Sequence, residues 1–281
     1  MNYLRLNLFF IFLLAGVSIL HAQEINSAKQ KLDIPSDFRK AKNGDIYIIA
    51  HRGAHNGIPE NSLAAYQKAI DLGCDFVEID IRTTKDGEFV SVHNSTIDAY
   101  VEGQTGKVKE MTLQELRALD IGSRIGKEWK GTQIPTFEEI VELCKGKIGI
   151  YLDLKDAPVS ELMAILKKYD MEKDVVWYFP ASYIQRVDDI NDLFANSFPM
   201  PDPGPAQNIT KVLSAINTCV IASDMGKLNE QFVETAHQNN ALVFVDEKSG
   251  TEAEWTQILE WKTDGIQTDH PEKLIEFLKN K

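Results

Sequence analysis

Residues 51–93 read HRGAHNGIPENSLAAYQKAIDLGCDFVEIDIRTTKDGEFVSVH, a stretch that combines several histidines, arginines and closely spaced acids. His51 and Arg52 come directly after one apolar run, and His93 comes directly after another. Glu78 and Asp80 lie two residues apart inside a third apolar run, so a strand would point both side chains to the same face. Titratable groups are costly to keep at the ends of buried strands without a use. The stretch therefore indicates an active site built on strand ends.

Outward from this stretch, short apolar runs alternate with amphipathic helical patterns. The expected strands are 46–50, 76–82, 89–93, 148–154, 175–179, 197–200, 219–223, 241–246 and 265–268. The expected helices are 61–72, 112–119, 136–144, 159–169, 183–194, 207–216, 228–239, 252–262 and 271–279. This alternation favours a parallel sheet, and about eight such units predict an α/β protein with a (β/α)8 TIM barrel of roughly 250 residues. A doubly wound open sheet is the alternative, but no GxGxxG follows the first run.

Several helix starts carry capping signals. Asn61 precedes the pattern at 61–72, and Gly73 follows its end, as expected for a helix with an asparagine N-cap and a glycine C-cap. Thr136 begins a later helix and has Glu139 three residues on, which predicts a capping box.

The chain outside the barrel units divides into three segments. The first 22 residues have an early positive charge and a short apolar core, which is typical of a secretory signal peptide cleaved after Ala22. A membrane anchor is the alternative, but the apolar core is short for a span of about 20 residues. We therefore expect an exported protein, periplasmic or secreted, without stable membrane insertion. Residues 23–44 are expected to form a polar leader, 45–281 the barrel, and about 94–135 an insertion over its catalytic face.

Charge and cysteine content restrict the possible partners. The net charge of −12 disfavours nucleic acid or an anionic membrane, since both require basic patches. It does not exclude an anionic substrate, because a bound cation reverses the local field within a site. Cys74, Cys144 and Cys219 are scattered through apolar surroundings, so we expect buried thiols, with a pairing among them left open.

Three acids are expected to meet at the C-terminal ends of the strands, where the active site of a parallel barrel forms. Glu78 and Asp80 come from one strand, and Asp153 ends the IGIYLDLK run. Their mutual repulsion would be relieved by a hard divalent cation, Ca²⁺ or Mg²⁺, with oxygen ligands. The alternative is that the acids form ion pairs with Arg52, Arg82 and Lys155.

The remaining strand-end residues suggest hydrolysis of an anionic ester. His51 and His93 suit general acid–base catalysis, because imidazole titrates near neutral pH. Arg52 offers a planar fork for a phosphate, and Lys155 offers a second point charge. These residues predict either phosphodiester cleavage or another metal-assisted hydrolysis.

The order and spacing of these motifs resemble the glycerophosphodiester phosphodiesterase family. The matching strings are HRG, PENS and VEIDIRTTKDGEFVSVH, followed later by YLDLK and by TDGIQTDHPEKL near the end. The resemblance covers about residues 46–277. It implies a TIM barrel with an insertion after the second strand, which agrees with the insertion expected from the residues.

The resemblance also implies roles for individual residues. His51 and His93 would be the acid–base pair, and Arg52 and Lys155 would bind the phosphate. Three acids would hold the divalent cation: Glu78, Asp80 and Asp153. The expected partner is a small glycerophosphodiester, hydrolysed to glycerol 3-phosphate and an alcohol. A phospholipase D-like or cyclising reaction on a lipid phosphodiester is the first alternative, and a catalytically idle barrel that binds a ligand is the second.

Two positions depart from the family pattern. Asp153 stands where glutamate is usual, so the cation site is one methylene shorter there. Asn94 stands where aspartate commonly follows the second histidine, so substrate contacts near His93 are expected to differ.

Four further residues receive weaker predictions. His55 is expected in a solvated loop, with contact to substrate as the alternative, and His237 is expected on a helix surface. Trp177 and Tyr178, at the end of a strand, are expected to line the substrate pocket.

Overall fold

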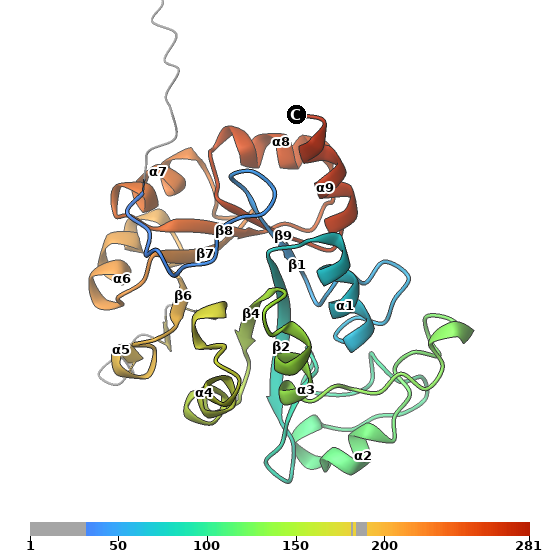
Figure 1. The fold of residues 1–281 in the computed structure, drawn as a ribbon. Coiled ribbons are helices and arrows are strands. Elements are labelled where there is room, and N and C mark those ends of the chain that lie inside the picture. Colours follow the sequence, from blue (N-terminus) through green and yellow to red (C-terminus); the bar gives the residue numbers. More distant parts are fainter. Residues whose placement is uncertain (1–31, 181, 184–189) are drawn as a thin grey trace, which may run out of the picture. The chain divides into compact units, whose positions relative to one another are not determined.

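Eight parallel strands form a nearly closed barrel in the computed structural model, which describes residues 32–180, 182–183 and 190–281 (Figure 1). The expected signal peptide and the first part of the leader lie outside the described residues. Neighbouring strands follow the order β6-β5-β4-β2-β1-β9-β8-β7. β6 and β7 lie next to each other, and no ladder joins them within the described ranges. The strands are β1 Tyr47–Ala50, β2 Phe76–Thr83, β4 Gly149–Leu154, β5 Val175–Pro180, β6 Phe198–Asp202, β7 Val220–Asp224, β8 Leu242–Asp246 and β9 Gly265–Thr268.

Helices follow the strands and cover the outside of the barrel, as the alternation of patterns predicts (Figure 1). Thr136 and Glu139 form the predicted capping box of α3. The expected helix at 183–194 is described only at its end, as α5. The helices are α1 Leu63–Leu72, α2 Leu113–Arg117, α3 Phe137–Cys144, α4 Val159–Lys168, α5 Ile190–Leu193, α6 Ile209–Ala215, α7 Glu230–Gln238, α8 Glu252–Glu260 and α9 Pro271–Lys279.

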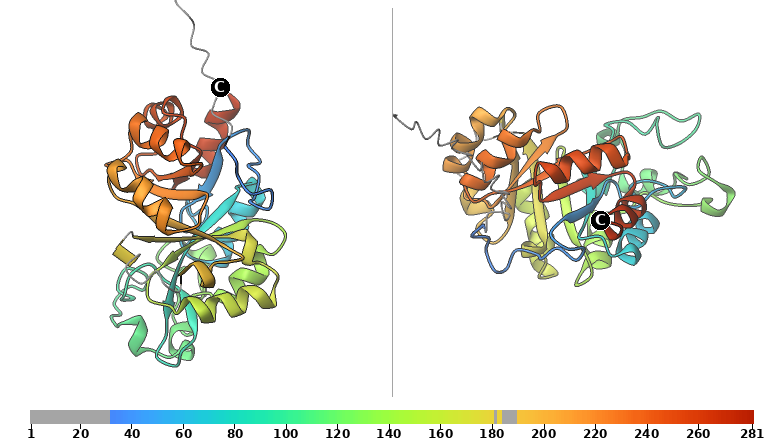
Figure 2. Two further views of the ribbon diagram at one scale, coloured as in Figure 1. Left: turned by 90° about the vertical axis from the view of Figure 1, so that its left-hand side faces the viewer. Right: turned by 90° about the horizontal axis from the view of Figure 1, so that it is seen from above.

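The apolar run at 89–93 does not contribute a barrel strand. Its residues Phe89–Ser91 form β3, which pairs antiparallel with the end of β2 and extends the sheet beyond the barrel. Between β3 and α3 the chain forms α2, two short 3-10 turns and loops around an apolar cluster of their own. This segment projects beyond the ring of helices (Figure 2). The Trp129 indole donates to the carbonyl of Gly57 at 2.7 Å and so ties the segment to the loop after β1.

Side chains along each strand alternate between two apolar regions, because a strand has a period of two. On β2, Val77 and Ile79 face the helices, whereas Phe76, Glu78 and Asp80 face the barrel interior. The outer region is the large core between sheet and helices. The inner one is apolar only near the N-terminal ends of the strands.

An aromatic plug closes the N-terminal end of the barrel. The leader runs across this end and inserts Phe38, which is 4% exposed. No described residue of the leader is helical. Gly149 leaves room for the plug, because a Cβ there would come within 2.5 Å of the Phe76 ring. The plug consists of Phe38, Tyr47, Phe76, Phe198 and Phe244, whose rings contact one another.

Two further predictions concern the cysteines and the membrane. Cys74, Cys144 and Cys219 are all buried free thiols, so the buried packing is confirmed and no pairing among them occurs. Within the described ranges, none of the helices has the length and apolarity required to cross a bilayer.

Candidate active site

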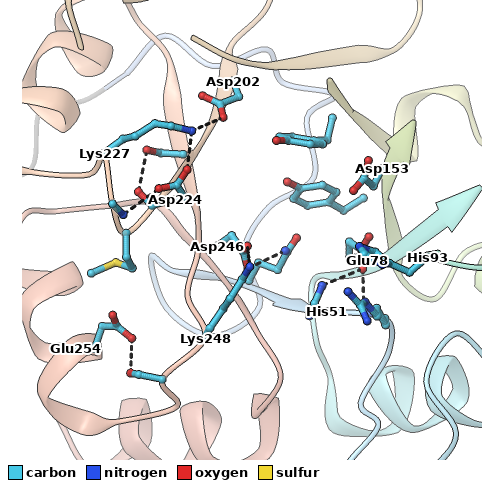
Figure 3. A pocket seen from close by; sticks show the side chains of 18 residues that line it. His51, Glu78, His93, Asp153, Asp202, Asp224, Lys227, Asp246, Lys248 and Glu254 are labelled. Atoms are coloured by element: carbon cyan, nitrogen blue, oxygen red, sulfur yellow. Dashed lines mark hydrogen bonds and ion pairs between the residues drawn. The ribbon is translucent and has the colours of Figure 1, made fainter. Parts of the chain in front are cut away.

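A cavity of about 750 Å³ opens at the C-terminal ends of the barrel strands (Figure 3). One side carries His51, Glu78, His93 and Asp153, which were all predicted as site residues. The other side carries acids and lysines from β6, β7, β8 and the loops and helix that follow them. These are Asp202, Asp224, Lys227, Asp246, Lys248 and Glu254.

A carboxylate cluster, formed by Glu78, Asp80 and Asp153, lies against the first side. Asp80 and Asp153 are directly opposite each other in the β2–β4 ladder, and one oxygen from each of the three groups lies within 4.8 Å of the others. Burial, together with the charges of Asp80 and Asp153, raises the pKa of Glu78 well above its usual value. Burial also raises the pKa of Asp153, against the opposing effect of Lys155.

The donor set of this cluster suits a hard divalent cation. All three groups offer carboxylate oxygens, the ligand type that Mg²⁺ and Ca²⁺ prefer. The Oδ1 atom of Asp80 is buried and accepts no hydrogen bond of good geometry, and its ion-pair partner is the Lys155 ammonium, so a metal ion would compete with Lys155 for this oxygen. The cluster therefore fits the predicted cation.

Lys155 and Arg52 show that the ion-pair alternative is partly realised. The Lys155 ammonium lies 3.1 Å from Asp80 Oδ1 and 2.5 Å from Asp153 Oδ2, so it contacts the acids directly. Arg52 Nε lies 3.7 Å from Asp80 Oδ2. Arg82 instead pairs with Asp156 and donates to the carbonyl of His93. Two cations do not neutralise three ionised carboxylates, so the cluster as a whole keeps a net negative charge.

The backbone of the HRG turn holds Glu78 in place. Arg52 has φ +51°, a left-handed conformation that is uncommon for a residue with a side chain, and its N–H donates to Glu78 Oε2 at 2.8 Å. Gly53 follows with φ +85°, and a Cβ there would come within 2.7 Å of Ala65, so only glycine fits. The Arg52 guanidinium also contacts Glu60 at 3.1 Å.

Asn61 orients the acid that lies deepest in the cluster. Its amide donates to Asp80 Oδ2 at 2.8 Å, and its carbonyl accepts from Tyr66 and Ser91 at 2.9 and 3.1 Å. The prediction that Asn61 caps α1 is wrong, because Ser62 is the N-cap and accepts from the Ala65 N–H. Asn61 has φ +52°, which turns its side chain inward to the cluster.

Each of the two candidate catalytic histidines is held through its Nδ1 atom. His51 Nδ1 lies 2.6 Å from Asp269 Oδ1, and its Nε2 lies 4.0 Å from Glu78 Oε2. His93 Nδ1 lies 2.9 Å from Asn94 Oδ1, so the residue that departs from the family pattern contacts the histidine itself. With Nδ1 engaged, Nε2 is the nitrogen left for proton transfer in both rings.

Asp269 and His55 are two site residues to which the sequence analysis assigned no role. The expectation of a solvated loop is wrong for His55, because its Nε2 lies 3.0 Å from Asp269 Oδ1. Burial raises the pKa of Asp269, but hydrogen bonds from His51 and His55 outweigh it and hold this pKa well below its usual value. The available signal was the position of Asp269 at the end of the last strand, where other site residues were placed.

Three weaker predictions have mixed outcomes. Tyr178 lines the cavity as expected, but Trp177 is fully buried on the opposite face of β5, where its indole donates to Ser197. The prediction for Trp177 is therefore wrong. His237 is not on the surface either: it is 5% exposed and contacts Asp264 at 2.8 Å.

Comparison with known proteins shows which family this chain belongs to. The family model for the glycerophosphoryl diester phosphodiesterase family matches residues 51–198. The glycerophosphodiester phosphodiesterase of Caldanaerobacter subterraneus is 37% identical over 46% of this chain and 56% of its own length. The Bacillus subtilis protein YhdW is 29% identical over 82% of this chain and 97% of its own length.

Solved structures support the fold. The glycerophosphodiester phosphodiesterase of Agrobacterium tumefaciens has a TM-score of 0.73 and 24% identity, over 82% of this chain and 99% of that one. A phosphodiesterase of Oleispira antarctica, solved with its product sn-glycerol 3-phosphate, has a TM-score of 0.73 and 23% identity over 84% of this chain and 97% of that one. The chain belongs to the glycerophosphoryl diester phosphodiesterase family, and is thus a phosphoric diester hydrolase.

Proposed function

We propose that this protein hydrolyses glycerophosphodiesters to glycerol 3-phosphate and a free alcohol, with a divalent cation bound at the carboxylate cluster. The observation that carries the proposal is the meeting of His51 and His93 with Glu78 and Asp153 in one cavity. The Caldanaerobacter relative is named a glycerophosphodiester phosphodiesterase, and the Oleispira structure holds its product sn-glycerol 3-phosphate; both support the same reaction class.

In the proposed reaction the two histidines move the protons. One imidazole takes a proton from the attacking water as its oxygen bonds to phosphorus. The other donates a proton to the alcohol oxygen as its bond to phosphorus breaks. Asp269 and Asn94 fix the ring orientations by holding Nδ1 of His51 and His93. This arrangement leaves each Nε2 available for the transfer.

The carboxylate cluster would hold the cation, Ca²⁺ or Mg²⁺, through Glu78, Asp80 and Asp153. When bound, the cation supplies positive charge that stabilises the negative charge developing on the phosphoryl oxygens. Arg52 and Lys155 supply further positive charge beside it. In this proposal Lys155 has two roles: it forms ion pairs with Asp80 and Asp153, and it offers positive charge to the phosphate.

The far side of the cavity favours a small polar alcohol over a lipid. Asp202, Asp224, Asp246 and Glu254 line it, with Lys227 and Lys248 between them. Lys227 is held by Asp202 at 2.9 Å. Burying an acyl chain against these groups would remove them from water, which is costly because two lysines cannot neutralise four acids. A hydroxylated or charged head group would keep them solvated or hydrogen-bonded.

A panel of glycerophosphodiesters, assayed with and without divalent cation, tests the proposal. We expect turnover with Mg²⁺ or Ca²⁺ and none after chelation, and we expect His51→Ala and His93→Ala to lose it as well. His270→Ala is the matched control, since His270 lies outside the cavity lining. Turnover within a few-fold of wild type in either catalytic variant would contradict the assignment.

Analysis of the product by phosphorus NMR separates hydrolysis from a cyclising reaction. Attack by water gives a phosphate monoester, whereas attack by the neighbouring glycerol hydroxyl gives a cyclic ester with a distinct resonance. A lasting cyclic product would replace the proposed hydrolysis by the phospholipase D-like or lyase alternative.

A further inference from the structure

A second group of ligand-type side chains lies beside the carboxylate cluster and has a different donor chemistry. This histidine–aspartate cluster consists of His51, His55 and Asp269, from the end of β1, the loop after it and the end of β9. One ligand atom from each residue lies within 4.8 Å of the other two. The proposed reaction uses His51, and Asp269 holds it, but His55 has no part in that reaction.

The geometry of this cluster is close to that of a metal site. His51 Nδ1 and His55 Nε2 approach the same oxygen of Asp269, at 2.6 and 3.0 Å. Tetrahedral zinc with bonds of about 2.0–2.1 Å sets its ligand atoms about 3.3 Å apart. The two nitrogen–oxygen distances therefore need to widen by less than about 1 Å for a cation to take the place of the hydrogen-bonding protons.

The cluster is also open to solvent. The side chains of His51, His55 and Asp269 are 15%, 22% and 34% exposed, so a cation can reach them and retain a water ligand. Two imidazole nitrogens and one carboxylate oxygen suit Zn²⁺ or Co²⁺, whereas Mg²⁺ and Ca²⁺ prefer the all-oxygen carboxylate cluster.

We propose that His51, His55 and Asp269 form an inhibitory site for Zn²⁺, distinct from the cation site of the carboxylate cluster. Binding there requires neutral rings with free Nδ1 on His51 and free Nε2 on His55, so the ring protons move to Nε2 of His51 and Nδ1 of His55, and the contact that orients His51 is broken. The His51 side chain is then held by the metal and no longer serves proton transfer. The binding stands on the geometry alone, whereas the inhibition rests on the proposed role of His51.

Direct binding is tested with Co²⁺ as the probe, on protein whose carboxylate cluster is kept filled by excess Mg²⁺. We expect visible ligand-field absorption from Co²⁺ bound to nitrogen ligands, with saturation near one equivalent. His55→Gln should weaken this binding at least about tenfold, since the amide still donates to Asp269 but is a poor ligand. His270→Gln, in the histidine next to Asp269 in the chain, should leave it unchanged.

Inhibition is tested by titrating ZnCl₂ into the Mg²⁺-supplied enzyme. We expect the half-inhibiting zinc concentration to rise at least about tenfold in His55→Gln, and to change little with the Mg²⁺ concentration. Inhibition that is relieved by Mg²⁺ and unchanged in His55→Gln would place zinc at the carboxylate cluster and overturn the proposal. An unchanged Co²⁺ spectrum in His55→Gln would overturn it as well. The spectrum needs no turnover, so a failure of the proposed function is recognised separately.

Discussion

The two ends of the barrel interior are built from the same strands yet have opposite chemistry. At the N-terminal end, Phe38 and Phe76 belong to the aromatic plug, where both side chains are buried among apolar neighbours. Two residues further along β2, on the same face, Glu78 begins the carboxylate cluster. The change takes place within about 7 Å, the rise of two residues in a strand.

The residues that stabilise the fold and the residues proposed for function therefore lie at opposite ends of the same strands. Burying the plug removes aromatic surface from water and stabilises the fold. Burying the carboxylates without a cation does the opposite, because burial and mutual repulsion raise the pKa of Glu78 and Asp153. Substitutions at the two ends should therefore have effects of different kinds.

Removing one charge from the carboxylate cluster should give the largest effect on turnover. Glu78→Gln retains an acceptor for the Arg52 N–H but lacks the carboxylate, so we expect hydrolysis to fall by about 10³-fold or more. The melting temperature of the metal-free protein should stay level or rise, since a strained buried charge has gone. Hydrolysis assays and thermal melts on the same samples check this; a variant that is both active and unstable would contradict it.

Emptying the plug should give the largest effect on stability. Phe38→Ala leaves a cavity beneath the barrel, and we expect the free energy of unfolding to drop by about 3–5 kcal/mol. Turnover per folded molecule should stay within about twofold, because the plug lies at the end of the barrel remote from the cavity. Denaturant unfolding with parallel kinetics measures both quantities. A conservative control, Phe38→Leu, should lose much less stability.

Asp269→Asn should have an intermediate effect that is confined to catalysis. The amide keeps a contact with the rings of His51 and His55 but loses the negative charge that selects and stabilises the His51 tautomer. We expect kcat to fall roughly 10–100-fold with KM nearly unchanged. An equal rise in KM would indicate that Asp269 contacts substrate rather than orienting His51.

Loss of the Asn61 amide should weaken cation binding more than it weakens folding. Asn61→Gly accommodates φ +52° without strain, so its effect comes from the lost side chain: the amide donor to Asp80 and the carbonyl that accepts from Tyr66 and Ser91. We expect the cation concentration for half-maximal activity to rise about 10-fold, with activity recovered at high cation concentration. Ser91→Ala, which removes one donor to the Asn61 carbonyl, should give a smaller shift in the same direction. Equal activity curves for wild type and Asn61→Gly would exclude this role.

The smallest predicted effect is a pH dependence of stability. Because the folded-state pKa of Glu78 and of Asp153 is raised, the metal-free fold keeps its full stability below their ordinary values and loses stability as the pH rises through the folded values. Bound cation should cancel this loss. We therefore expect the rise in melting temperature caused by Mg²⁺ or Ca²⁺ to grow between about pH 5 and pH 8. A stabilisation independent of pH would contradict the raised values.

The sequence was sufficient to predict the barrel and most of one side of the cavity. Period-two alternation placed Glu78 and Asp80 on one face, and the run of strands and helices predicted the parallel order. The prediction of a barrel strand at 89–93 was wrong. The apolar pattern of this run is the same whether the strand lies in the barrel or pairs antiparallel beyond it.

The remaining site residues depend on contacts between distant segments. Asp269 meets His51 across more than 200 positions of sequence, which no local pattern encodes. Asn61 resembles an ordinary helix cap until its left-handed backbone turns the amide toward Asp80. Trp177 and Tyr178 are neighbours in sequence, and only the register of β5 decides which of them lines the cavity.

The central claim is that the carboxylate cluster holds a cation that the reaction requires and the fold does not. The most direct measurement follows hydrolysis of a glycerophosphodiester and near-ultraviolet circular dichroism on one chelated sample, as Mg²⁺ or Ca²⁺ is added back. The account predicts a folded but inactive chelated protein, whose turnover returns on a saturation curve that Glu78→Gln shifts or abolishes. Full turnover in the chelated wild-type protein would contradict it.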